Sequence, residues 1–267
     1  MFIVKVPGIN SSGKTNGCEK SGNLILSNLK EISNNEKGNL IDTKLLDLEE
    51  IHLDNSNLEL TNKLIYENSL EIFEEKPKTI FLGGDHSISY SITLAFLDYC
   101  KKIQKEPGLV VFDSSPNCFE SGSKFPKNKE WVNQLIKTGF PPENIFLVGI
   151  RNFSSSEISF LKKRNLKFML MNPFHENLED SCDTIMEFLR DKESYVSIDL
   201  SIIDPAFAPG VSFKEPGGLT SREFLYVIQR INLLKNLRGV DIVEINPEKD
   251  MGDLTVKLGA KILSELI

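Results

Sequence analysis

The chain has 267 residues, of which 40% are hydrophobic and 26% charged, and this balance is typical of a folded globular protein. Its formal net charge of -7 excludes a basic surface that would attract nucleic acid. No apolar run is long enough to cross a membrane. We therefore expect a soluble cytoplasmic protein that has neither nucleic acid nor a membrane as a partner.

Short apolar runs alternate along the chain with longer segments of helical periodicity. The runs predict strands over residues 2–6, 79–82, 109–112, 144–149, 167–171, 195–198 and 239–243. The periodic segments predict helices that begin near 21 or 23 and at 154, and that cover 58–73, 87–99, 131–138, 178–189, 221–233 and 254–266. Regular alternation favours right-handed βαβ units. The expected fold is α/β, a three-layer αβα arrangement with a mostly parallel sheet, in a single domain over residues 1–267.

Acidic and imidazole side chains stand at the ends of four predicted strands. His86 follows a glycine pair, Asp113 and Asp199 end two apolar runs, and Glu244 ends a fourth. Ligands of open α/β sheets bind outside the carboxyl ends of the strands. One histidine together with carboxylates suits a divalent ion such as Mn²⁺. The sequence therefore predicts a metal site at this edge of the sheet.

The segment from Gly8 to Thr15 offers a different reading, because it matches the phosphate-loop pattern GxxxxGK[ST] and follows the first strand. A phosphate loop must open directly into a helix, whose N-terminus forms part of the anion site. Gly17 and Gly22 oppose a helix at that place. A nucleotide-binding protein remains one alternative, and a flexible loop beside the active edge is the other reading of the segment.

Several short motifs stand out along the chain: GGDHS at 83–87, the aspartate- and proline-rich segment 197–210, GGLTSRE at 217–223, DIVEINP at 241–247, VGIRN at 148–152 and the loop 13–20. These motifs resemble those of the ureohydrolase family of arginases and agmatinases, and the loop 13–20 is similar to that of prokaryotic agmatinase-like members. The resemblance covers essentially the whole chain. It implies an arginase-like fold, a Mn²⁺-dependent hydrolysis of a guanidinium C–N bond, and a homo-oligomer, either a trimer or a hexamer.

The metal ligands that the resemblance implies are only partly present. The family holds two Mn²⁺ ions with the His of GGDHS, a DxHxD motif and a DxD motif. His86 matches the first, Asp113 opens the second and Asp199 opens the third. The changed positions are Ser115 in place of the His of DxHxD, Asn117 in place of its second Asp, and Ser201 in place of the second Asp of DxD.

Charge balance indicates what these changes do. Two divalent ions side by side in a partly dry site repel each other unless four carboxylates neutralise them, and only Asp113 and Asp199 remain. We therefore expect at most one divalent ion, Mn²⁺ before others, or none. His86, Asp113 and Asp199 would hold it together with the carbonyl oxygen of Asn117, which is a neutral ligand.

The resemblance also implies roles at the substrate. Glu244 matches a carboxylate that clamps the guanidinium group, for which a bidentate pair is favoured, although a carboxylate there can also cap a neighbouring turn. Asn128 stands where relatives have a histidine that shuttles protons, and asparagine does not titrate near neutral pH. Asp85, Asp204 and Asp241 are expected to orient turns or the imidazole.

These observations favour a pseudoenzyme or binding protein that lacks the usual two-metal activity and takes a small cationic guanidine-like ligand. The site residues assigned to its chemistry are Glu244, Asp113 and Asn128. The alternative is a hydrolase that uses one metal ion on the C–N bond of an agmatine- or arginine-like substrate.

Overall fold

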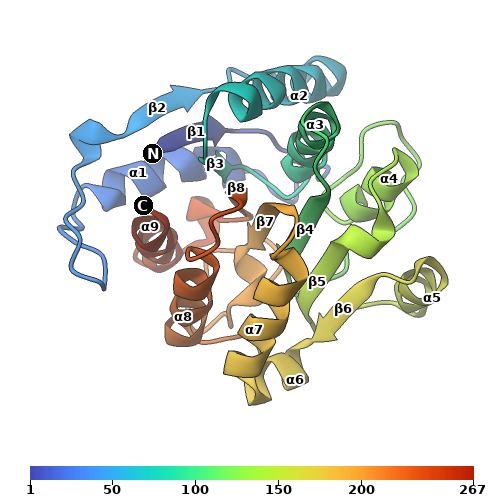
Figure 1. Ribbon diagram of the computed structural model, residues 1–267. Coiled ribbons are helices and arrows are strands. Elements are labelled where there is room, and N and C mark those ends of the chain that lie inside the picture. The colour runs from blue at the N-terminus through green and yellow to red at the C-terminus, as the bar shows by residue number, and fades with distance from the viewer.

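Eight strands form one sheet with helices on both faces in the computed structural model, which describes residues 1–267 (Figure 1). The strands are β1 (Phe2–Val6), β2 (Asp47–Glu50), β3 (Thr79–Gly83), β4 (Pro107–Phe112), β5 (Ile145–Ile150), β6 (Lys167–Leu170), β7 (Glu193–Asp199) and β8 (Leu237–Val243). The helices are α1 (Ser21–Leu29), α2 (Leu58–Glu75), α3 (Ile88–Lys102), α4 (Trp131–Lys137), α5 (Ser155–Arg164), α6 (Met171–Glu176), α7 (Leu178–Leu189), α8 (Ser221–Ile231) and α9 (Leu254–Leu266).

The strands lie in the order β2-β1-β3-β8-β7-β4-β5-β6. Every neighbouring pair is parallel. The α/β prediction is therefore confirmed, and the sheet is parallel throughout rather than mostly parallel. Parallel sheets are covered on both faces, which explains why their strands are apolar along their whole length.

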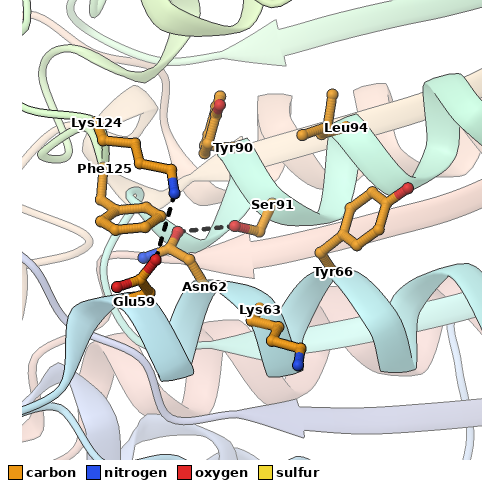
Figure 2. Close-up of a pocket in the computed structure, with 9 residues that line it drawn as sticks. All are labelled: Glu59, Asn62, Lys63, Tyr66, Tyr90, Ser91, Leu94, Lys124 and Phe125. Carbon is orange, nitrogen blue, oxygen red and sulfur yellow. Dashed lines mark hydrogen bonds and ion pairs between the residues drawn. The ribbon is translucent and has the colours of Figure 1, made fainter.

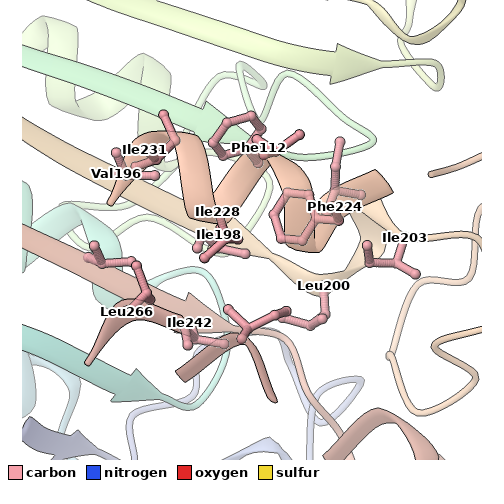
Figure 3. Packing of buried hydrophobic residues seen from close by; sticks show 14 of the residues in the cluster. Phe112, Val196, Ile198, Leu200, Ile203, Phe224, Ile228, Ile231, Ile242 and Leu266 are labelled. Carbon is pink, nitrogen blue, oxygen red and sulfur yellow. The ribbon is translucent and has the colours of Figure 1, made fainter. Parts of the chain in front are cut away.

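The two faces of the sheet form two hydrophobic cores. Along β4, Val110 and Phe112 belong to one core, whereas Leu109 and Val111 belong to the other, as the two-residue period of a strand requires. The first core includes residues of α1, α6, α7, α8 and α9, and the second includes residues of α2, α3 and α4. Figure 3 shows the first core, where Val196 of β7 lies among residues of α8.

Many strand and helix ends differ from the sequence-based expectations by one to three residues, and two short elements were missed. The edge strand β2 was missed because three of its four residues are acidic and the strand is mostly exposed, so that it has no apolar run that would mark it. Met171 begins α6 instead of ending β6, and Pro173 is tolerated in the first turn of that helix. Helix α8 ends at Ile231 rather than at 233. No helix of the chain has both the length and the apolarity that a bilayer span requires.

Candidate functional site

Four consecutive strands of the sheet, β3, β8, β7 and β4, bring the predicted residues to one edge. His86 follows β3, Glu244 follows β8, Asp199 ends β7 and Asp113 follows β4. The strands are in register there, because Phe112 lies opposite Ile198 on the neighbouring strand. The side chains of these four residues are all buried. The ends of four strands therefore bring these side chains together in one polar cluster inside the protein.

The glycine pair before His86 permits a close approach of two backbones. A Cβ atom on Gly84 would lie 2.0 Å from the carbonyl oxygen of Gly8, which is far inside contact distance. The amide of Glu244 donates a hydrogen bond of 3.0 Å to the carbonyl oxygen of Gly84. Only glycine fits where these two backbone segments approach each other. This close approach positions the turn that carries His86.

The loop with the phosphate-loop pattern folds around an internal carboxylate. Asp85 Oδ2 accepts hydrogen bonds of 2.7 Å from the backbone N–H of Asn10 and of 2.7 Å from the hydroxyl of Thr15. Helix α1 begins only at Ser21, after a short 3₁₀ turn. Two donors of the loop already bind the carboxyl group of Asp85 within the chain, and nothing in the loop geometry favours a nucleotide site.

His86 lies between the two aspartates. Its Nδ1 atom is 2.9 Å from Asp113 Oδ2 and 3.1 Å from Asp199 Oδ2. Burial by itself lowers the pKa of His86, but the hydrogen bonds to both aspartates outweigh it and raise that pKa well above its usual value. Burial and then the charge of Asp113 raise the pKa of Asp199 to about 6. These three side chains form a group whose candidate ligand atoms all lie within 4.8 Å of one another.

A hydrogen-bond chain beneath the ring fixes the orientation of His86. Its Nε2 atom is 2.9 Å from the hydroxyl of Ser197, which donates a bond of 2.7 Å to Asp241 Oδ1. Tyr195 donates a bond of 2.9 Å to the other oxygen of Asp241. Asp241 therefore orients the imidazole through Ser197, which is one of the two roles that the sequence left open for this aspartate. Ser197 itself was missed, although it stands two residues before Asp199 on the same strand face.

The positions that differ from the family pattern supply neutral donors. Ser201 donates a hydrogen bond of 3.1 Å to Asp113 Oδ1, and the backbone N–H of Ser115 donates one of 2.8 Å to the same oxygen. Asn117 donates its amide N–H to Asp113 Oδ2 at 2.6 Å. The carbonyl oxygen of Asn117 was expected to face the site, but the carboxylate of Asp113 attracts the amide hydrogens instead. Half a turn of that amide would present its oxygen.

Glu244 uses one oxygen within the chain and leaves the other free. Oε1 accepts hydrogen bonds of 3.0 Å from the backbone N–H of His86 and of 3.0 Å from the side chain of Asn128. Oε2 is buried and has no hydrogen-bond partner. Burial, and then the charges of Asp199 and Asp85, raise the pKa of Glu244 well above its usual range. A buried oxygen without a donor is rare, and it indicates a place for a hydrogen-bonding ligand.

Asn128 contacts Glu244 directly, which the sequence did not predict. The hydroxyl of Ser11 donates a hydrogen bond of 2.9 Å to Asn128 Oδ1, so the amide has a defined orientation. Asp204 lies apart from this cluster and caps turns, since it accepts bonds of 2.9 Å from the N–H of Ala206 and 2.7 Å from that of Gly217. Its role is structural.

A separate hollow of about 300 Å³ lies between α2 and α3. Figure 2 shows its walls, where Lys124 pairs with Glu59 at 3.3 Å and Ser91 donates a hydrogen bond of 2.7 Å to Asn62. None of the residues predicted for metal or ligand binding lines this hollow. The cluster of His86, Asp113, Asp199 and Glu244 therefore lies away from this hollow.

A fully parallel αβα sheet that brings a histidine and two aspartates together at its carboxyl edge offers ligands that suit a divalent metal ion. The sequence profile described as "Arginase family" matches residues 1–267, and the chain belongs to that family. Arginase 1 of Arabidopsis thaliana is 32% identical over 212 residues, which are 76% of this chain and 58% of that protein. The chain thus spans less than two thirds of the length of that plant relative.

Bacterial relatives are covered more completely. Formimidoylglutamase of Bacillus subtilis strain 168 is 26% identical over 272 residues, which cover 98% of this chain and 84% of that protein. The crystal structure of formimidoylglutamase from the same species superposes with a TM-score of 0.89 at 23% identity, over 99% of this chain and 84% of that one. This likeness confirms the arginase-like fold.

Proposed function

We propose that this protein binds a small guanidine or amidine cation and lacks the two-metal hydrolysis associated with its family. The observation that carries the proposal is Oε2 of Glu244, which is buried and has no donor within the chain. Glu244 is only 2% exposed, so its free oxygen faces the interior and not bulk water. A planar cation with several N–H groups matches a carboxylate in such a position.

The donor set fits one divalent ion and does not fit two. His86, Asp113 and Asp199 offer one imidazole nitrogen and two carboxylates within 4.8 Å, which balances the charge of a single ion. A second divalent ion would depend on Ser115 and Ser201 as ligands, and the side chains of both residues are neutral. Manganese is the ion we expect first, because imidazole together with carboxylate oxygens suits it. A divalent ion held there supplies Lewis acidity when it is bound.

The chain's own residues can bind and orient a guanidine but cannot move its protons easily. Glu244 accepts the N–H groups of the cation, and Asn128 holds Glu244 through Oε1. Asn128 has no proton to exchange near neutral pH, so the position offers orientation without acid–base chemistry. Groups that act together in catalysis fail together when some are missing.

A hydrolase that uses one metal ion is the second candidate. It is supported by the buried group of His86, Asp113 and Asp199, whose imidazole is held by Ser197 and Asp241. Its substrate would be a C–N bond of an arginine- or agmatine-like molecule. The two candidates share the guanidine site and differ in turnover.

The experiment measures metal and turnover on the same preparation. The protein is purified without chelator, and Mn, Fe and Zn per chain are determined by mass spectrometry. Urea and ammonia release from arginine and agmatine are then assayed with added Mn²⁺, and methylguanidine binding is measured by calorimetry. Guanidine binding without turnover supports the first proposal, and two ions per chain with turnover would overturn it. Turnover with one ion per chain supports the second candidate. Light scattering tests the trimer or hexamer that we also propose.

A further inference from the structure

Helices α4 and α5 and the segment 118–120 line a hollow of about 460 Å³, and none of the residues assigned to metal or guanidine binding lies in its walls. The two helices follow the neighbouring parallel strands β4 and β5, so both run back from the carboxyl edge of the sheet and point the same way. One end of the hollow therefore lies beside their first turns and the other end beside their last turns. These two ends differ in chemistry.

The end beside the first turns has an unused hydrogen-bond acceptor, the side-chain oxygen of Asn133. Asn133 is only 4% exposed. Its Nδ2 atom donates a hydrogen bond of 3.0 Å to the carbonyl oxygen of Cys118, whereas Oδ1 is buried and has no partner. Half a turn of the amide would set two oxygens against each other, so the bond to Cys118 fixes its orientation. An unpaired buried acceptor in the wall of a hollow indicates a ligand that donates a hydrogen bond.

The end beside the last turns is basic. Lys137 lies one turn after Asn133 on α4, and Lys163 and Arg164 lie in the last turn of α5. Lys137 pairs at 3.3 Å with Glu120, the only acidic residue of the lining. Neither Lys163 nor Arg164 forms an ion pair. Basic side chains stabilise any helix C-terminus, so these cations indicate an anionic ligand only together with the unpaired amide oxygen.

The wall between the two ends is aromatic. Phe119 and Phe160 both line the hollow, and Phe119 is 39% exposed although it is large and apolar. The guanidinium carbon of Arg164 lies 5.9 Å from the ring centroid of Phe160, so the aromatic wall continues to the basic end. Flat heterocycles such as nucleobases stack favourably on aromatic side chains. The volume of the hollow is also within the range of small-molecule sites.

We propose that this hollow binds a phosphorylated molecule with a flat, amino-bearing ring, of which an aminopurine nucleoside monophosphate is the example. The amino group donates to Oδ1 of Asn133, the ring packs against the phenylalanines, and the phosphate meets Lys163 and Arg164. Ser156 and Lys163 line opposite ends of the hollow and are two turns apart on α5, roughly 10 Å. This separation suits a molecule whose donor and anion lie at opposite ends. The site is additional to the guanidine site and does not depend on it.

The test compares three ligands by calorimetry on the whole chain, at low salt and without added metal. AMP carries both the amino group and the phosphate, adenosine lacks the phosphate, and purine riboside 5′-monophosphate lacks the amino group. AMP is expected to bind, and each of the other two to bind roughly tenfold more weakly, because each loses one polar contact. High salt should bring the affinity of AMP close to that of adenosine.

The variants remove the basic end without touching the metal cluster. K163E/R164E should abolish AMP binding, and K163Q/R164Q should reduce it to the level of adenosine. Lys162→Glu is the matched control, because Lys162 is exposed in the same last turn of α5 and does not line the hollow. It should bind AMP within about twofold of the wild type. Thermal unfolding without ligand checks that each variant is folded.

Two results would overturn the site itself: no binding of AMP to the wild type, or equal binding to K163E/R164E. Equal affinities of AMP and purine riboside 5′-monophosphate would overturn the role of Asn133 and with it the ligand class. Competition between AMP and methylguanidine would place the nucleotide at Glu244 and overturn the inference as well. AMP binding that depends on the amino group, the phosphate and the two basic residues, and that survives in K162E, supports it whether or not a guanidine binds.

Discussion

The amide nitrogen of Asn128 lies 3.0 Å from Oε1 of Glu244, across 116 residues of sequence, while Oε2 of the same carboxylate meets no donor in the chain. The pair combines a fixed carboxylate with a free acceptor. Buried acceptors are normally satisfied, and leaving one unpaired reduces the stability of the folded state. The unpaired Oε2 atom is what we expect of a site where ligand binding is retained at a cost in stability.

Replacing this carboxylate by its neutral isostere should separate stability from binding. Burial and then the charges of Asp199 and Asp85 raise the pKa of Glu244, so the ionised form is disfavoured in the fold. Glu244→Gln is expected to remove measurable methylguanidine binding and to stabilise the protein by about 1 kcal/mol, a rise in Tm of roughly 2–4 °C. Calorimetric titration and thermal unfolding check this. Exposed Glu143→Gln is the control, and guanidine affinity that survives in Glu244→Gln would contradict the site.

Restoring the family's ligands should restore a second ion. Ser115→His, Asn117→Asp and Ser201→Asp together add two carboxylates to Asp113 and Asp199. Four buried carboxylates repel one another without metal, so the apo variant should unfold several degrees below the wild type. Added Mn²⁺ should raise its Tm more than that of the wild type and bring two ions per chain. The same three positions changed to alanine give the control. Unchanged metal content in the restored variant would show that the assignment of these positions is wrong.

The turn before His86 should not accept a side chain. A Cβ on Gly84 would lie 2.0 Å from the backbone oxygen of Gly8, and a backbone atom cannot move aside as a flexible side chain can. Gly84→Ala is expected to destabilise the protein by more than about 2 kcal/mol and to lower metal affinity, because the turn carries His86. Urea unfolding and metal titration measure both effects. Gly122→Ala is the matched control, since its Cβ would meet no atom within 4 Å. Equal stabilities of the two variants would contradict the close approach of the Gly84 and Gly8 backbones.

A lysine far from the site predicts a pH dependence. Burial lowers the pKa of Lys78 from 10.5 to about 8, and its ammonium donates to Asn232 Oδ1 at 2.5 Å and to the carbonyl of Leu266 at 3.0 Å without a carboxylate partner. Below pH 8 the folded state holds a disfavoured charge. As the pH rises through 8, the folded state releases the proton while the unfolded state keeps it, and the wild type gains stability.

The variant Lys78→Met cannot make that gain. Its free energy of unfolding relative to the wild type should therefore fall between pH 7 and pH 9, by up to about 1.4 kcal/mol per pH unit. Urea unfolding of both proteins at the two pH values measures the difference directly. Ionisation of tyrosines and cysteines affects both proteins alike and cancels. A difference that stays constant with pH would rule out the lowered pKa of Lys78.

The strands that carry the site were predictable because their signal is local. An apolar run such as Val110 to Phe112 followed by Asp113 marks a buried parallel strand and its carboxyl end without any knowledge of neighbours. The edge strand β2 gave no such signal, because three of its four residues are acidic and the strand is mostly exposed. The start of α6 at Met171 was hidden because the preceding strand is short and continues directly into the helix.

The sequence by itself determined the family, the parallel αβα fold and the convergence of His86, Asp113, Asp199 and Glu244, since strand periodicity and motif spacing are properties of short segments. Only the tertiary structure decided which atoms face one another. The amide orientation of Asn117 and the contact between Asn128 and Glu244 depend on segments brought together from distant parts of the chain. Hydrogen bonds require distances and angles that folding alone sets, and no local pattern encodes them.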